Sequence, residues 1–492
     1  MLKRILTRQW SFFWAGVGFG VAQIIYMIAG YIKAAADGKP LVSNPITVTT
    51  NLGGMFRGIE VFWWGGKTFG LEKGLYGSAF SVDTWGPILG MILGGLLVAL
   101  AERESRAWAR YSPKMLLTSL VGGFIFSYGT RLAGGCTLNH LLGGIPLMSI
   151  KSTVVILFMT IGGLSMFFLM AKMGVGSYFK HQETLSYVKS AREKNLLADG
   201  VTYDPNYNPW RDPWRWAGMA FLVLFLVPAI YYFFSPESKH SVPNSGWLFM
   251  GLTLLAGVVG GFAMAKSGFG TECALVSAEA SAMLKKDEER FARMGIPAIT
   301  RTLFKGLLPL QGLLASIVIT GVFAVGAWVL FGVNLGFQSP VKNQLNWAAM
   351  LGGLLLGAGA VALIGCEIRS YMRLGLGYTN TLIGFIGFAL GYLPYTLFYE
   401  QHKAFEEIIL VQEYTWGQLL FPNNIAAQQI FAVIWTLALF GALIWAIRAG
   451  ARNLKVQTVH VLNRSTEDLQ LGVEGAPVVT QPQPVPTFGS AD

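Results

Sequence analysis

Three cysteines, Cys136, Cys273 and Cys366, are the residues of this chain best suited to chemistry, and each ends a glycine-rich segment. The segments read RLAGGC, KSGFGTEC and VALIGC. No two cysteines have CxxC spacing, which argues against a zinc site or a thioredoxin-like motif. A single membrane cysteine is most often a small packing residue. Three cysteines that all end glycine-rich segments instead predict a column of thiols, each at a position where glycines weaken a helix.

Polar and ionisable residues accompany every cysteine. They are Arg131, Asn139 and His140 around Cys136, Lys266 and Glu272 before Cys273, and Glu367 and Arg369 after Cys366. Such residues within a membrane are costly and usually functional. Arg131 either balances a passing anion or holds the free carbonyls of a broken helix. The two glutamates either pair with the neighbouring cations or accept a thiol proton. Arg369 and Arg373 are alternatively anchors at the cytoplasmic boundary, and His140 is as easily structural as functional.

The sequence lacks the motifs of several enzyme classes. It has no HExxH, no GxxxxGK[ST] and no CxxCH, so we expect no metal, no nucleotide and no haem. The net charge of +11 comes without a nucleic-acid-binding motif, which argues against a nucleic-acid partner. We therefore predict a protein that is not an enzyme and carries no cofactor.

The composition is that of a polytopic membrane protein. Hydrophobic residues make up 53% of the 492 positions, charged residues only 13%, and the mean hydropathy is +0.50. Runs long enough to cross a bilayer predict ten crossings. The predicted spans are about 12–33, 86–101, 117–150, 153–171, 216–234, 247–265, 306–333, 347–365, 381–399 and 428–447. Within 117–150 we expect a helix, an unwound segment and a second short helix.

The loops between the spans differ in charge. Lysine and arginine concentrate in alternate segments, among them 102–114, 172–215, 284–305 and 367–378. The positive-inside rule places these segments, and both termini, in the cytoplasm. Residues 34–84 are then an external loop, 172–215 a cytoplasmic insert with a solvated helix, and 455–492 a disordered cytoplasmic tail.

The chain also contains an internal repeat. GGFIFSYGTRLAGGC (122–136) aligns with GGLLLGAGAVALIGC (352–366), 230 residues later, at its paired glycines and at the final Gly-Cys. We predict two copies of a five-crossing unit, 1–236 and 247–450. Because five is odd, the copies are inverted, as in many transporters whose site lies between the repeats. The predicted fold is thus all-α and polytopic, with two inverted repeats and glycine-broken helices.

The segments GTRLAGGCTLNHLLGG and GAVALIGCEIRS resemble the YeeE/YedE sulfur-transport family of bacterial inner-membrane proteins. The resemblance covers about residues 12–450. It implies an inner-membrane permease for a small sulfur oxyanion, thiosulfate or a related compound. It also implies that the thiols of Cys136, Cys273 and Cys366 line the route and form transient S–H···S hydrogen bonds. Cys273 departs from the pattern, since GTEC lacks the Gly-Cys pair.

Two other functions stay open at this point. One is a membrane sulfur relay, in which a cysteine thiolate carries a persulfide to a soluble acceptor. The other is a passive small-anion channel in which the cysteines only pack. For the permease, the partners are the substrate, the lipid bilayer and, as a further candidate, a cytoplasmic sulfur-carrier protein.

Overall fold

The computed structural model describes most of the membrane portion of the chain. The described residues are 9–46, 48, 56, 59, 62–63, 82–101, 109–173, 201–203, 208–234, 246–268, 270–289, 298–338, 343–363 and 365–463. The predicted external loop 34–84, the insert 172–215 and the tail therefore lie largely outside them.

The described chain is built almost entirely of helices. They are α2 (Phe12–Ala36), α5 (Val82–Ala101), α6 (Pro113–Ala133), the π-helix η3 (Leu138–Gly144), α7 (Ile150–Lys172), the 3₁₀ turn η4 (Pro209–Arg211), α10 (Pro213–Phe234), α11 (Gly246–Ser267), α12 (Thr271–Lys286), α14 (Ala298–Lys305), α15 (Leu308–Phe331), α16 (Trp347–Leu363), α17 (Glu367–Leu376), α18 (Thr379–Leu397), α19 (Tyr399–Glu406), α20 (Trp416–Leu420), α21 (Ile425–Leu454) and α22 (Thr458–Asn463).

Three short strand pairs join neighbouring loops. β1 (Val42–Ser43) runs parallel to β4 (Asn334–Leu335). β2 (Ala109–Tyr111) is antiparallel to β3 (Val201–Tyr203), and β5 (Leu345–Asn346) is antiparallel to β6 (Ile409–Val411). These pairs satisfy loop backbone groups, and no layer of sheet is built from them.

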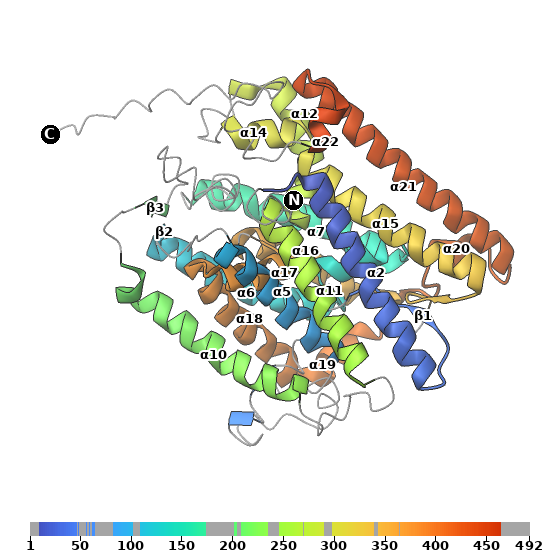
Figure 1. Cartoon of the computed structure of the whole chain (residues 1–492), viewed down its shortest axis with the longest axis horizontal. Helices are drawn as coiled ribbons and strands as arrows, with labels where there is room; N and C mark the ends of the chain where they lie inside the picture. Colours follow the sequence, from blue (N-terminus) through green and yellow to red (C-terminus); the bar gives the residue numbers. More distant parts are fainter. Residues whose placement is uncertain are drawn as a thin grey trace.

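The molecule is an all-α, multi-pass membrane protein. Every predicted span contains a helix, and the predicted limits agree with the observed ones to within a few residues for most spans. Seven of the described helical spans are long and apolar enough to cross a bilayer, and the bent pair α18–α19 makes an eighth if it counts as one span. The prediction of ten adds α5, whose apolar part is shorter, and α6, which is less apolar. Both lie toward the middle of the bundle, whereas α10 and α21 lie at opposite edges (Figure 1).

Glycine-rich helix faces bring the central helices into backbone contact. Gly122 of α6 lies against Leu363, and Gly352 of α16 lies against Ala133, so α6 and α16 run antiparallel. Small residues let helices approach closely in a membrane, where packing drives association. α2 and α11 are also antiparallel along their contact. Antiparallel pairing of these helices is what two inverted copies require.

Four further helix pairs are in close contact at glycines and run parallel. Gly353 lies beside Val155 and Gly357 beside Met159, so α16 runs parallel to α7. α6 runs parallel to α18 in the same way, α5 to α11, and α2 to α15. These four pairs each join a helix of one predicted copy to a helix of the other. The inverted repeat remains a prediction that these orientations support.

Two predicted segments differ from the structure. Residues 367–378, expected as a cytoplasmic loop, form the buried helix α17, which packs on α5 and α11. The predicted disordered tail begins with a helix, α22, because Val461 is buried and the Asn463 side chain accepts a hydrogen bond from Trp14 Nε1 (2.9 Å). Residues 464–492 lie outside the described part.

Candidate functional site at two glycine–cysteine breaks

The first break separates α6 from η3. α6 begins with Ser112 as its N-cap and Pro113 in its first turn, and it ends because Gly134 takes a left-handed conformation with φ of 71°. The Gly135 N–H donates to the Thr130 carbonyl at 3.0 Å. The chain then turns helical again, and the His140 N–H donates to the Cys136 carbonyl at 3.0 Å. Cys136 thus lies at the junction of two helical segments.

The second break repeats this geometry between α16 and α17. The Gly365 N–H donates to the Ala360 carbonyl, and the Ser370 N–H donates to the Cys366 carbonyl, both at 2.9 Å. Each bond lies 230 residues after its counterpart at the first break. Cys366 is the N-cap of α17 and has extended backbone angles. The repeated sequence motif therefore encodes a repeated backbone structure.

Both described thiols face the protein interior. Cys136 and Cys366 are 0% exposed, belong to one hydrophobic core and are not in a disulfide. A thiol that only filled space toward lipid would not be enclosed in this way. Both thiols are therefore enclosed by protein.

Tyr371 connects the two breaks. Its hydroxyl donates to Glu367 Oε1 at 2.6 Å, and Glu367 directly follows Cys366. The same hydroxyl is close enough to the Cys136 thiol for an electrostatic interaction. Tyr371 and Glu367 are both 0% exposed. The sequence analysis missed Tyr371, although its position one helical turn after Glu367 was a usable signal.

Asn139 and His140, the polar neighbours of Cys136, pack against Gly135. A Cβ atom at Gly135 would collide with Asn139 Nδ2 and would lie 3.0 Å from His140 Nε2. His140 Nδ1 shares a hydrogen bond of 3.0 Å with Ser152 Oγ, which fixes the ring. Lys151, which the sequence analysis also missed, is buried on α7 and interacts electrostatically with His140. Both predicted polar residues therefore lie at the break.

Arg369 and Arg373 occupy the corresponding place at the second break. A Cβ atom at Gly365 would lie 2.8 Å from Arg373 Nη1 and 3.5 Å from Arg369 Cδ. The two arginines are 1% and 2% exposed. The interpretation of them as boundary anchors is therefore wrong, because the short helix that carries them is enclosed by α5, α11 and α18.

Among the described residues, most buried charged side chains are cations. The buried cations are Lys151, Arg215, Lys266, Arg369 and Arg373, and the only buried carboxylate in these ranges is Glu367. Lys266 is 0% exposed in the last turn of α11, which packs on α17. Buried cations of this kind can interact with an anion.

The Arg131 side chain contacts a different group of residues from those around Cys136. Its guanidinium lies over the rings of Tyr395 (4.5 Å) and Tyr392 (5.2 Å), and it interacts electrostatically with Glu406. The Tyr395 hydroxyl donates to Glu406 Oε1 at 2.8 Å. The side chain therefore joins α6 to the α18–α19 corner, a set of partners that the sequence did not predict.

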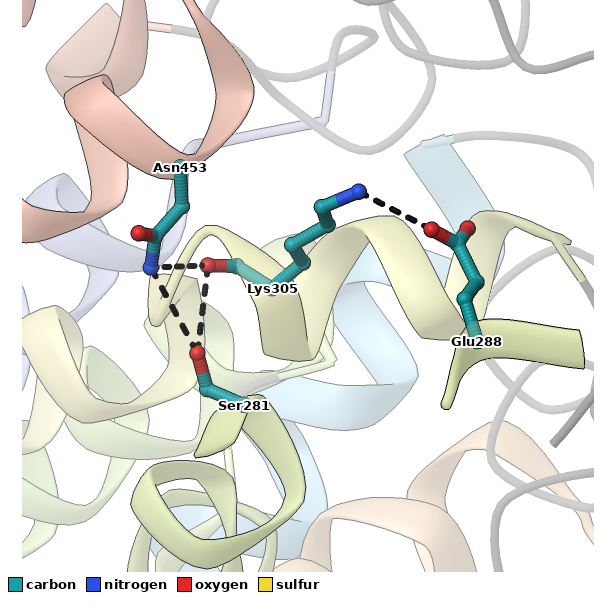
Figure 2. A network of polar contacts seen from close by, with 4 residues as sticks. All are labelled: Ser281, Glu288, Lys305 and Asn453. Atoms are coloured by element: carbon teal, nitrogen blue, oxygen red, sulfur yellow. Dashed lines mark hydrogen bonds and ion pairs between the residues drawn. The ribbon is translucent and has the colours of Figure 1, made fainter. Parts of the chain in front are cut away.

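The third cysteine is placed only by its helix. Cys273 and Glu272 lie in the first turn of α12, and their side chains are outside the described part of the structure. α12 packs on α7, α15 and α16. Its far end is fixed by Ser281 Oγ, which donates to the Lys305 carbonyl (3.4 Å), and by Asn453 of α21, whose Nδ2 donates to the same carbonyl (2.9 Å) (Figure 2). The role of Cys273 remains a prediction.

The described residues offer no obvious metal site. In these ranges, no three His, Cys, Asp or Glu side chains gather closely enough to hold an ion. The candidate site therefore consists of thiols, hydroxyl groups and buried cations.

Comparison with known proteins relates the first of the two breaks to a family. Residues 1–165 match the family described as sulphur transport, a range that includes the Cys136 break. The thiosulfate transporter TsuA of Spirochaeta thermophila is 30% identical over 79 residues, which are 16% of this chain and 24% of TsuA. The matched stretch thus spans about a quarter of that relative. Residues 1–165 are thus similar to the sulphur transport family, the YeeE/YedE family that the glycine–cysteine motifs of this chain resemble.

Proposed function

We propose that this protein is a permease of the bacterial inner membrane for thiosulfate or a closely related sulfur compound. The observation that carries the proposal is the pair of Gly-Cys breaks, which share backbone geometry, enclose both thiols and each have a residue that interacts with Tyr371. The family match and the similarity to a thiosulfate transporter support it. The distribution of loop charge supports cytoplasmic termini.

The chemistry of the site suits a soft anion. A thiol is a weak hydrogen-bond donor, so it can hold a terminal sulfur briefly without trapping it. The buried cations around the breaks offset the substrate's charge while it is out of water. Several modest sites in series permit conduction, whereas one strong site would retain the substrate. The thiols stay protonated in this scheme, and no covalent step is needed. Cys273 supplies the third thiol, and a soluble sulfur carrier is the proposed acceptor in the cytoplasm.

The test is uptake by the purified protein in proteoliposomes. Radiolabelled thiosulfate should enter in a saturable manner, and unlabelled thiosulfate should compete, whereas sulfate should not, because sulfate lacks a terminal sulfur. Folded protein that transports no sulfur compound would contradict the proposal. A stable persulfide on Cys136 or Cys366 during turnover, detected by mass spectrometry, would favour the relay instead.

A Tyr371→Phe substitution tests the connection between the breaks. It removes the hydroxyl that donates to Glu367 and leaves a buried carboxylate without that donor, at a cost of about 1–3 kcal/mol. We expect thiosulfate uptake to fall about tenfold while the protein still folds. Tyr231→Phe on α10 is the matched control, since that side chain is exposed on the outer face of the bundle. Equal uptake by both variants would remove Tyr371 from the site.

A further inference from the structure

A pocket with a volume of about 690 Å³ opens at the C-terminal end of α21, far along the chain from the cysteines. Its lining includes Gly441, Ile444, Trp445, Arg448, Arg452 and Lys455. The turn that leads into α22 closes one side with Val456 and Thr458. These residues belong to a helix whose opposite face is already occupied, because Asn453 binds the Lys305 carbonyl at the α12–α14 junction (Figure 2).

The pocket is strongly basic. Arg448 and Arg452 lie one helical turn apart on α21, and Lys455 is its C-cap; all three are exposed and line the pocket. No carboxylate is among the lining residues, and within the described ranges no ion pair involves these three side chains. Three unneutralised cations on one wall are suited to a phosphate group.

The same side of α21 is apolar beyond the pocket. Ile430, Ile434 and Leu437 are each about 60% exposed, and Trp445 is 53% exposed where the apolar surface meets the cations. Tryptophan favours this position at a membrane–water interface. At Gly441, no heavy atom lies within 4 Å of the position a Cβ would occupy, so the helix surface has an open gap there. α21 lies at the edge of the bundle (Figure 1), where lipid would contact it.

We propose that this pocket binds an anionic phospholipid of the leaflet at that end of α21. Arg448, Arg452 and Lys455 hold the headgroup phosphate, and an acyl chain lies along the gap at Gly441 toward Leu437. Basic pockets beside membrane helices recognise lipid headgroups in this way. The predicted orientation makes it the cytoplasmic leaflet. The proposal is independent of the transported substrate.

The test is thermal unfolding of the full chain in neutral detergent, titrated with phosphatidylglycerol, phosphatidylcholine or inorganic phosphate. Phosphatidylglycerol should raise the unfolding temperature saturably, and the other two should have little effect. The variant R448Q/R452Q/K455Q should lose apparent affinity by about fivefold for each charge removed. The control K172Q/K285Q/K286Q removes three exposed lysines elsewhere and should keep it. Gly441→Leu adds a side chain where no heavy atom lies within 4 Å of the Cβ position, leaves the charge unchanged and should lower the affinity several-fold.

Each remaining outcome contradicts the proposal. An equal effect of phosphatidylcholine would mean a non-specific lipid coat. An equal effect of inorganic phosphate would mean that the ligand is a free anion. An equal loss of phosphatidylglycerol affinity in the two triple variants would mean that the effect depends only on net charge. Unchanged affinity in Gly441→Leu would mean that no acyl chain lies in the gap at Gly441.

Discussion

Replacing Cys136 or Cys366 with alanine should lower thiosulfate uptake about a hundredfold, which corresponds to a barrier raised by about 2–3 kcal/mol. Each thiol is fully buried at a helix break, and each removal deletes one site from a series that has few members. Conduction through several weak sites fails when the gap between neighbours grows, because the substrate must then leave one site before it reaches the next. The measurement is initial uptake into proteoliposomes, normalised to the amount of folded protein.

The loss should not come from unfolding. Removing a single sulfur atom from the core costs about 1 kcal/mol, far less than the removal of a large side chain. Thr436→Ala is the matched control, since it deletes a buried hydroxyl on α21 whose hydrogen bond lies within its own helix. Cys→Ser at either position should recover only a little uptake, because an oxygen donor keeps the size but not the soft contact. If the double variant C136A/C366A transports normally, the thiols only pack.

The sequence predicted the helices well because apolar length is a strong signal in a membrane protein. It also located the two breaks, since Gly-Cys ends both α6 and α16. It was wrong about residues 367–378. Arginines near the end of a span read as boundary charges under the positive-inside rule, yet α17 carries Arg369 and Arg373 into the interior. A hydropathy average assigns each charged residue the same cost wherever it lies. It therefore cannot identify a buried helix whose charged residues have polar neighbours on the same helix.

The contacts between helices that the sequence did not predict share one cause. Tyr371 and Lys151 reach the breaks from α17 and α7, and their proximity depends on how those helices pack. Periodicity within one segment cannot predict a contact between segments that the repeat brings together. Arg131 shows the converse, because a residue five positions before Cys136 points to the α18–α19 corner. The short sequence separation from Cys136 was therefore a poor guide to the residues that the Arg131 side chain contacts.

The second large effect is expected at Gly357, where α16 meets α7. A Cβ atom there would collide with the backbone carbonyl of Met159, which cannot move aside as a flexible side chain can. Gly357→Ala should therefore force the two helices apart, and overpacking of this kind costs about 1–3 kcal/mol or more. Because α16 leads directly into the Cys366 break, we expect a lower unfolding temperature and reduced uptake together. The measurements are thermal unfolding in detergent and uptake by the protein that remains folded.

Gly326→Ala on α15 separates this clash from the general effect of replacing glycine in a helix. No heavy atom lies within 4 Å of the position its Cβ would take. Alanine favours a helix over glycine by about 1 kcal/mol, so this variant should be as stable as the parent protein or slightly more so. If both variants unfold at the same temperature, the α16–α7 contact is looser than the structure indicates. If only Gly357→Ala is destabilised, the close approach of these two helix backbones is what holds the second break in position.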